Sequence, residues 1–168
     1  MKSQGLFRRI VLSWDWILAL IVVIAASYSI PQGANIGYAK ELYSTGISVL
    51  SIVFSLFLTS LAVLITAGDN EFVRFLEEDG SYTRIVSTFK ITFLLLSLSL
   101  VSAIVLHAIS LRVYEVEPQA LVSRSQLLLF SFVGMYSLLA TVQSSLDMLK
   151  YAELRARFLN LTSRRKEE

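Results

Sequence analysis

The segment from Leu42 to Thr66, LYSTGISVLSIVFSLFLTSLAVLIT, contains no charged residue and constrains the fold more than any other part of the chain. About 20 apolar residues cross a hydrocarbon core of roughly 30 Å, so this segment is long enough to span a bilayer as a helix. Its small and hydroxyl-bearing residues recur every three or four positions, which places them on one helical face. This face, the hydroxyl stripe, consists of Ser44, Ser48, Ser51, Ser55, Thr59, Ala62 and Thr66.

Three further apolar runs indicate that the whole chain is an integral membrane protein. Of its 168 residues, 55% are hydrophobic, and they are grouped in long stretches bounded by charged or turn residues. This pattern predicts an all-α fold with four transmembrane helices, at about 10–30, 44–67, 83–111 and 125–148. The absence of cysteine excludes disulfides, thiolate catalysis and Cys-ligated metals.

The basic residues predict the orientation of these helices. Eleven Lys and Arg lie in the N-terminal arm, the middle connection and the C-terminal segment, whereas three lie in the other two connections. Lys and Arg near spanning helices are retained on the cytoplasmic side. We therefore expect a multi-pass protein of the cell inner membrane with both termini in the cytoplasm.

The segments outside the membrane have distinct predicted structures. Residues 1–9 form a basic cytoplasmic arm, and residues 69–80 form an amphipathic elbow that Gly80 ends, with Ser81 capping the next helix. The fourth helix is expected to continue into the cytoplasm to about Leu161, so that 149–168 is an amphipathic helix with a charged tail. In the outer connections we expect a short helix at Tyr38–Tyr43 and, at Arg112–Glu117, either a short strand or an extended loop.

Asp15 is a carboxylate placed inside an apolar segment, between Trp14 and Trp16. An acid within a membrane helix is costly unless it is paired or hydrated, and such residues mark functional sites. The alternative is that Asp15 lies at headgroup depth and pairs with Arg8, Arg9 or a basic residue of the last helix. Both interpretations stay open at this stage.

The third and fourth apolar segments also carry small polar residues at helical spacing. One set is Thr88, Thr92, Ser99, Ser102 and Ser110, and the other is Gly134, Ser137, Thr141, Ser144 or Ser145, and Met148. Small residues let membrane helices pack closely, which is the simplest explanation for each set. A four-helix unit is not expected to bury all three sets and Asp15 by itself. We therefore expect a homo-oligomer in which one set faces an aqueous path.

The hydroxyl stripe is the preferred wall of that path because it is unbroken along its helix. The predicted pore-lining residues are Ser48, Ser51, Ser55, Thr59 and Thr66. A hydroxyl-lined wall with few charges predicts a weakly selective channel with an apolar gate. The alternative is a non-conducting anchor or regulatory subunit of a larger membrane complex. Because no catalytic motif or cofactor-binding pattern is found, we expect neither an enzyme nor a bound cofactor.

The four apolar runs, the elbow DNEFVRFLEEDG at 69–80 and the basic stretch KYAELRARF at 150–158 give the chain an architectural resemblance to the small membrane effectors of bacterial anti-phage systems. The resemblance implies a protein that permeabilises or depolarises the inner membrane when a cytoplasmic nucleotide or oligonucleotide signal, or a soluble partner, acts on it. It also implies that basic side chains near the C-terminus bind the anionic signal. These are Lys150, Arg155, Arg157, Arg164 and Arg165, for which contact with anionic lipid is the alternative.

Overall fold

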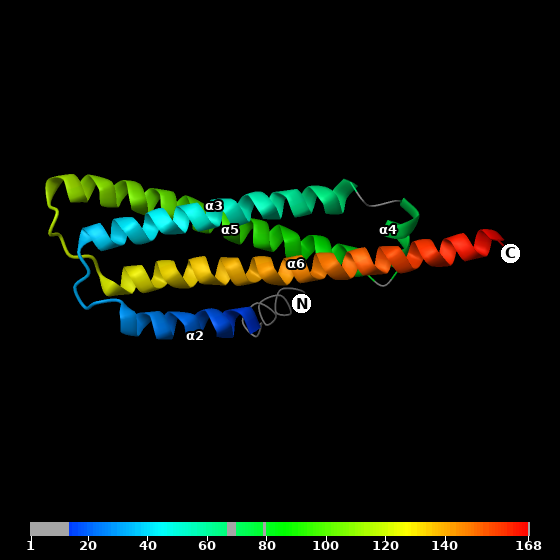
Figure 1. Ribbon diagram of the computed structural model, residues 1–168, viewed down its shortest axis with the longest axis horizontal. Coiled ribbons are helices and arrows are strands. Elements are labelled where there is room, and N and C mark those ends of the chain that lie inside the picture. The colour runs from blue at the N-terminus through cyan, green and yellow to red at the C-terminus, as the bar shows by residue number, and fades with distance from the viewer. Residues whose placement is uncertain (1–13, 67–69, 79, 168) are drawn as a thin grey trace, which may run out of the picture.

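The computed structural model describes residues 14–66, 70–78 and 80–167, and in these ranges the fold is all-helical. The elements are α2 (Trp14–Ser29), α3 (Ile36–Thr66), α4 (Asn70–Glu77), α5 (Ser81–Val116) and α6 (Arg124–Glu167). The four longer helices lie side by side, and the short α4 lies at one end of the bundle (Figure 1). The basic arm 1–9, the first residues of the expected first helix, Asp69 and Asp79 fall outside the described residues.

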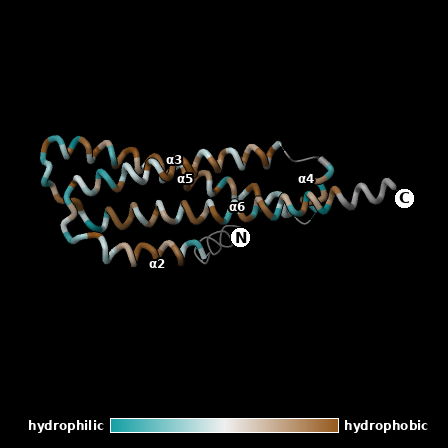
Figure 2. The backbone as a smooth tube through the Cα atoms, viewed as in Figure 1, coloured by the Kyte–Doolittle hydropathy of each residue, from teal (hydrophilic) through white to brown (hydrophobic). Residues whose placement is uncertain are grey.

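Three of the described helices are long and apolar enough to cross a membrane. Their candidate spans are Ile36–Val63, Ser81–Val116 and Arg124–Leu159. The described part of the first apolar segment, α2, is shorter, with 16 residues. Hydrophobic residues dominate the central parts of the long helices, and hydrophilic residues gather at the ends of the bundle (Figure 2). The chain is therefore consistent with a membrane location.

Aromatic and aliphatic side chains hold the helices together. Between α3 and α5, the rings of Phe57 and Phe89 stack with centroids 5.2 Å apart. The α2 helix packs along α6, where Trp16 meets the edge of Phe132 at 6.0 Å. Figure 1 shows α2 on the side of α6 away from α3, so α6 is the central helix of the bundle.

Gly46 permits a close approach between α3 and α6. A Cβ atom at this position would lie 2.7 Å from Cζ of Phe130, closer than real Cβ contacts. The ring of Phe130 also meets Tyr43 edge-on at 4.8 Å. The helices thus approach here because the sequence supplies a residue without a side chain.

The end of the bundle with the α2–α3 and α5–α6 connections differs from the sequence-based expectation. The α3 helix begins at Ile36 and not near residue 44, so Tyr38–Tyr43 is part of it. Residues 112–116 are the last turn of α5, so both the strand and the extended loop expected at Arg112–Glu117 are wrong. The helix persists because no Gly or Pro interrupts it before Pro118, and Arg112 and Glu115 form an ion pair of 3.3 Å on its surface. The two connections are joined by backbone bonds, from Ile36 N to Ala120 O and from Val122 N to Ala34 O.

At the opposite end, α4 leads into α5 through a glycine turn. Gly80 has a left-handed φ of 70° and precedes the first residue of α5, which is Ser81. Gly80 and not Ser81 therefore occupies the N-cap position of this helix, contrary to expectation. The carboxylate of Glu77 accepts bonds from the backbone N–H and the hydroxyl of Thr83 at 3.1 and 2.6 Å.

The α4 helix packs against the distal part of α6 through aromatic rings. Phe72 lies 5.2 Å from Tyr151 and 5.5 Å from Phe158, and Phe75 lies 5.3 Å from Phe158. No ion pair between described residues links α4 to α6. α6 itself is continuous for 44 residues and passes the expected end near Leu161.

Candidate functional site

The polar residues of α5 and α6 meet in a buried line of contacts, the hydroxyl seam, formed by Thr92, Ser99, Ser137 and Ser144. The hydroxyls of Ser99 and Ser137 are 2.5 Å apart, and those of Thr92 and Ser144 are 2.8 Å apart. Ser137 donates to Val133 O and Ser144 to Ala140 O. Either hydroxyl of each pair can be the donor across the seam. Each of these two small-residue sets thus contributes two buried hydroxyls to the seam, whereas Thr88 and Ser102 bond to the backbone of their own helix.

The hydroxyl stripe of α3 has the opposite environment. All seven of its residues, from Ser44 to Thr66, are exposed on the surface of the chain. The predicted pore-lining residues Ser48, Ser51, Ser55, Thr59 and Thr66 therefore lie together on one uncovered face. Within one unit, the α3 set is therefore uncovered, whereas the α5 and α6 sets are paired in part, through the four residues of the seam.

Hydrogen bonds within α3 satisfy part of the stripe. Ser48 donates to Ser44 O at 3.1 Å, Thr59 to Ser55 O at 3.0 Å and Thr66 to Ala62 O at 2.9 Å. Among the described residues, no partner is found for the hydroxyls of Ser44, Ser51 and Ser55. Three of the six hydroxyls of the stripe thus bond to the helix backbone, which lowers the cost of facing lipid, and the other three are available to water or to another chain.

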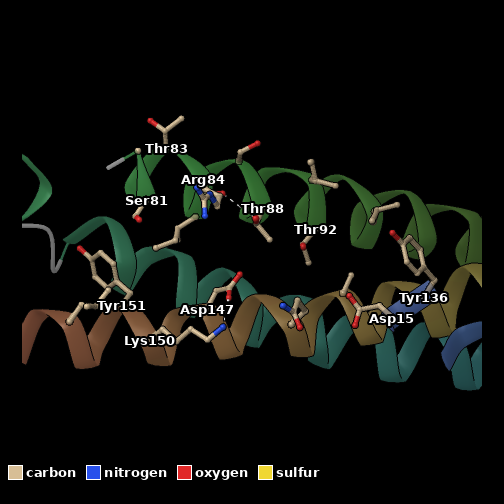
Figure 3. Close-up of a pocket in the computed structure, with 18 residues that line it drawn as sticks. Asp15, Ser81, Thr83, Arg84, Thr88, Thr92, Tyr136, Asp147, Lys150 and Tyr151 are labelled. Atoms are coloured by element: carbon tan, nitrogen blue, oxygen red, sulfur yellow. Dashed lines mark hydrogen bonds and ion pairs between the residues drawn. The ribbon is translucent and has the colours of Figure 1, made fainter. Parts of the chain in front are cut away.

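A second polar feature is a cleft of about 730 Å³ between α2, α5 and α6. Its charged lining residues are Asp15, Arg84, Asp147 and Lys150. Uncharged polar residues contribute as well: Ser81, Thr83, Ser87, Thr88, Thr92, Tyr136, Gln143 and Tyr151. In Figure 3, Asp15 and Tyr136 lie at one end of the cleft, and Ser81 and Tyr151 lie at the other.

The charges of the cleft are unequally paired. Asp147 and Lys150 form an ion pair of 3.3 Å. Asp15 is half-buried, and among the described residues its carboxylate has no hydrogen bond or ion pair. None of the described basic side chains of the last helix pairs with Asp15, and Arg8 and Arg9 lie outside the described residues. Asp15 lies at the end of the cleft where Tyr136 of α6 also lies (Figure 3).

The basic residues proposed to bind an anion do not form one cluster with described geometry. Lys150 lies in the cleft, whereas Arg155 is half-buried and Arg157 is exposed further along α6. Arg164 and Arg165 belong to the last turns of α6, and their side chains are not among those described. His107 of α5 contacts Lys40 O of α3 through Nδ1 at 3.2 Å.

Sequence reasoning did not find the cleft. Gln143 and Arg84 lie far apart in the sequence and belong to no motif, so only the packing of α5 against α6 brings them together. The one available signal was the position of Asp15 in an apolar segment. No family model matches the sequence, and no curated protein or solved structure is significantly similar to it.

Proposed function

We propose that this chain is the subunit of a homo-oligomeric membrane channel whose wall includes the hydroxyl stripe of α3. The observation that supports the proposal is the contrast in burial between the helices. Thr92 and Ser99 of α5 and Ser137 and Ser144 of α6 are covered by each other in the seam, whereas the stripe is uncovered over the length of α3. Copies of a small membrane protein form closed symmetric rings through such uncovered faces.

The proposed placement has four spans with both termini in the cytoplasm. The antiparallel arrangement of α2, α3, α5 and α6 fits this placement, since it puts α4 and the C-terminal part of α6 at one end of the bundle (Figure 1). That end carries most of the basic residues, which favours the cytoplasmic side. The inner membrane of a bacterium is the location that the resemblance to anti-phage effectors implies.

In this arrangement, large apolar residues beside the stripe form the closed gate. Ile52 and Leu56 are 63% and 64% exposed and lie on α3 within the stripe's length. A narrow ring of such side chains expels water and blocks ions without a charged barrier. A small rotation of α3 then exchanges apolar side chains for hydroxyls, so the pore opens without breaking the seam of α5 and α6.

Ionic current across a planar bilayer containing the purified protein tests the proposal. We expect current with the wild type, alone or with a cytoplasmic nucleotide added, and a large reduction for Ser55→Leu or Thr59→Leu. Ser102→Leu is the control, because Ser102 of α5 is half-buried and bonds to Leu98 O at 2.7 Å as Thr59 bonds to its own helix. Unchanged current in both α3 variants, with normal expression, would exclude the stripe as the wall.

Cysteine substitution adds a test of assembly, because the chain has no native cysteine. We expect Ser55→Cys to form disulfide-linked or reagent-linked dimers in membranes if copies meet at the stripe. Lys90→Cys provides the comparison on an exposed position of α5. A protein that migrates as a monomer in mild detergent and gives no cross-link at either position would contradict a ring.

One observation favours the second candidate, a non-conducting anchor for a soluble partner. α6 continues as one helix past its apolar part, and α4 supports it through the contacts of Phe72 and Phe75 with Phe158. This candidate predicts no current and a partner that is lost when residues 150–168 are removed. The bilayer recording therefore distinguishes the two functions.

A further inference from the structure

The cleft between α2, α5 and α6 extends into the part of the chain expected inside the membrane. Between Arg124 and Tyr136, α6 rises about 18 Å, and between Arg124 and Gln143 about 28 Å, at 1.5 Å per residue. Asp15 lines the cleft with both Tyr136 and Gln143. If Arg124 marks the outer surface, Asp15 lies in the inner half of a hydrocarbon core of about 30 Å.

The second argument comes from the lining. A cleft filled by lipid chains would be expected to have apolar walls at this depth. Here Thr88, Gln143 and Asp15 line it beside the apolar Ile91 and Leu95, and Figure 3 shows Thr88 and Thr92 on the side of α5 that faces α6. Thr92 is satisfied by Ser144, but Asp15 has no partner among the described residues. A carboxylate at this depth that no basic residue pairs requires water, a proton or a cation.

We propose that the cleft is a water-filled vestibule open to the cytoplasmic side, in which Asp15 attracts and binds a monovalent cation. The carboxylate of Asp15 is a hard oxygen group that suits such an ion, and the oxygen groups of Tyr136 and Gln143 line the same cleft. Asp147 offsets Lys150 near the middle of the cleft, so the deep end is negative. Arg84 is the charge that opposes cation entry, and it lies toward the Ser81 end (Figure 3).

The inference extends the proposed function by naming the ion class and its entry, and it depends on the proposed membrane placement. It does not depend on conduction, because accessibility to a reagent is measured without a current. A channel that conducts through the α3 stripe while this cleft is dry would contradict the inference and leave the proposed function intact. A cleft that holds water in a protein that conducts no ions would support the inference and contradict the proposed function.

Two pairs of adjacent residues test for water. Leu95 and Gln143 line the cleft, whereas Leu94 and Val142 do not line it and are each 57% exposed. The two residues of each pair are adjacent in one helix and lie at nearly the same depth in the membrane. Single cysteine variants at these positions therefore compare a residue in the cleft with a neighbour outside it. In membrane vesicles, a membrane-impermeant thiosulfonate on the cytoplasmic side should modify Leu95→Cys and Gln143→Cys about tenfold faster than their neighbours. Equal or slower reaction at both cleft positions would overturn the proposal.

The charge of the reagent tests the role of Asp15. With Leu95→Cys as the reporter, a cationic thiosulfonate should react faster than an anionic one of similar size, and Asp15→Asn should reduce this ratio by about tenfold. Asp15→Glu keeps the charge and should keep the ratio, which separates electrostatics from misfolding. If Asp15→Asn leaves the ratio unchanged while the thiol still reacts, Asp15 is not the cation site.

Discussion

The hydroxyl seam of α5 and α6 and the hydroxyl stripe of α3 are both built mainly from Ser and Thr that share a helical face, yet they have opposite environments. In the seam, Ser99 and Ser137 bond to each other across two helices and are buried. In the stripe, Ser48 and Thr59 bond to their own backbone and stay exposed. A row of small polar residues therefore allows close packing but does not require it.

The difference suggests that the seam and the stripe have separate roles, the seam in packing α5 against α6 and the stripe in contacts outside the chain. The seam makes α5 and α6 one rigid pair, since small side chains let their backbones approach and the hydroxyls fix the register. The stripe has no such partner within the described chain, so α3 is the helix whose polar face is available to another copy or to water. Substitutions in the two regions should therefore change the free energy of unfolding by different amounts.

The largest expected effect is on the seam. Ser137→Leu forces a large side chain into a fully buried position and breaks the bond from Ser99, which should lower the free energy of unfolding by about 2–3 kcal/mol. Unfolding of the protein in mixed micelles, followed by the loss of helical signal as denaturing detergent increases, measures this. Ser55→Leu on the exposed stripe is the control and should change stability by less than about 0.5 kcal/mol. Equal losses for both variants would remove the distinction between seam and stripe.

Two glycines provide the next comparison. Gly46→Ala places a methyl group against Phe130 at the α3–α6 contact and should destabilise the protein by about 1–2 kcal/mol. Gly134→Ala in α6 meets no atom within 4 Å and should stabilise the helix by up to about 1 kcal/mol. The same unfolding assay gives both values. A neutral Gly46→Ala would mean that α3 and α6 do not approach as closely as described.

A double-mutant cycle measures the seam bond itself. For Ser99→Ala and Ser137→Ala we expect a coupling energy of about 0.6 kcal/mol, as for other hydrogen bonds between membrane helices. The cycle of Ser51→Ala with Ser55→Ala should give no coupling, because no bond joins these two residues. Coupling in the stripe but not in the seam would reverse the assignment of the two regions.

The smallest effect is expected for Thr59→Val. The hydroxyl of Thr59 bonds to Ser55 O of the same helix, so an isosteric apolar side chain loses little and should leave stability within about 0.5 kcal/mol of the wild type. If the stripe faces water in the pore, the same variant should still reduce the current. A clear loss of stability without a change in current would indicate that Thr59 is a packing residue.

The all-helical fold was predictable from residues that act locally. The uncharged run containing Ser55 and Thr59 forms one helix, and Pro31 follows the last turn of α2. The sequence was a weaker guide where two local patterns favoured different structures. The alternating pattern at Arg112–Glu117 suggested a strand, but in the absence of Gly or Pro the preceding helix continued through it.

What the sequence alone determined is the period of each polar face, because helix geometry assigns Ser99, Ser137 and Ser55 to their faces without reference to other elements. Only the tertiary structure decided which faces meet, since identical spacing on three helices gives no information on pairing. The same holds for the cleft, where Asp15, Gln143 and Arg84 come from three helices. Their positions around one cleft depend on how α2 and α5 pack on either side of α6. That packing is set by the shapes of the side chains between the helices and not by the helical repeat of the polar residues.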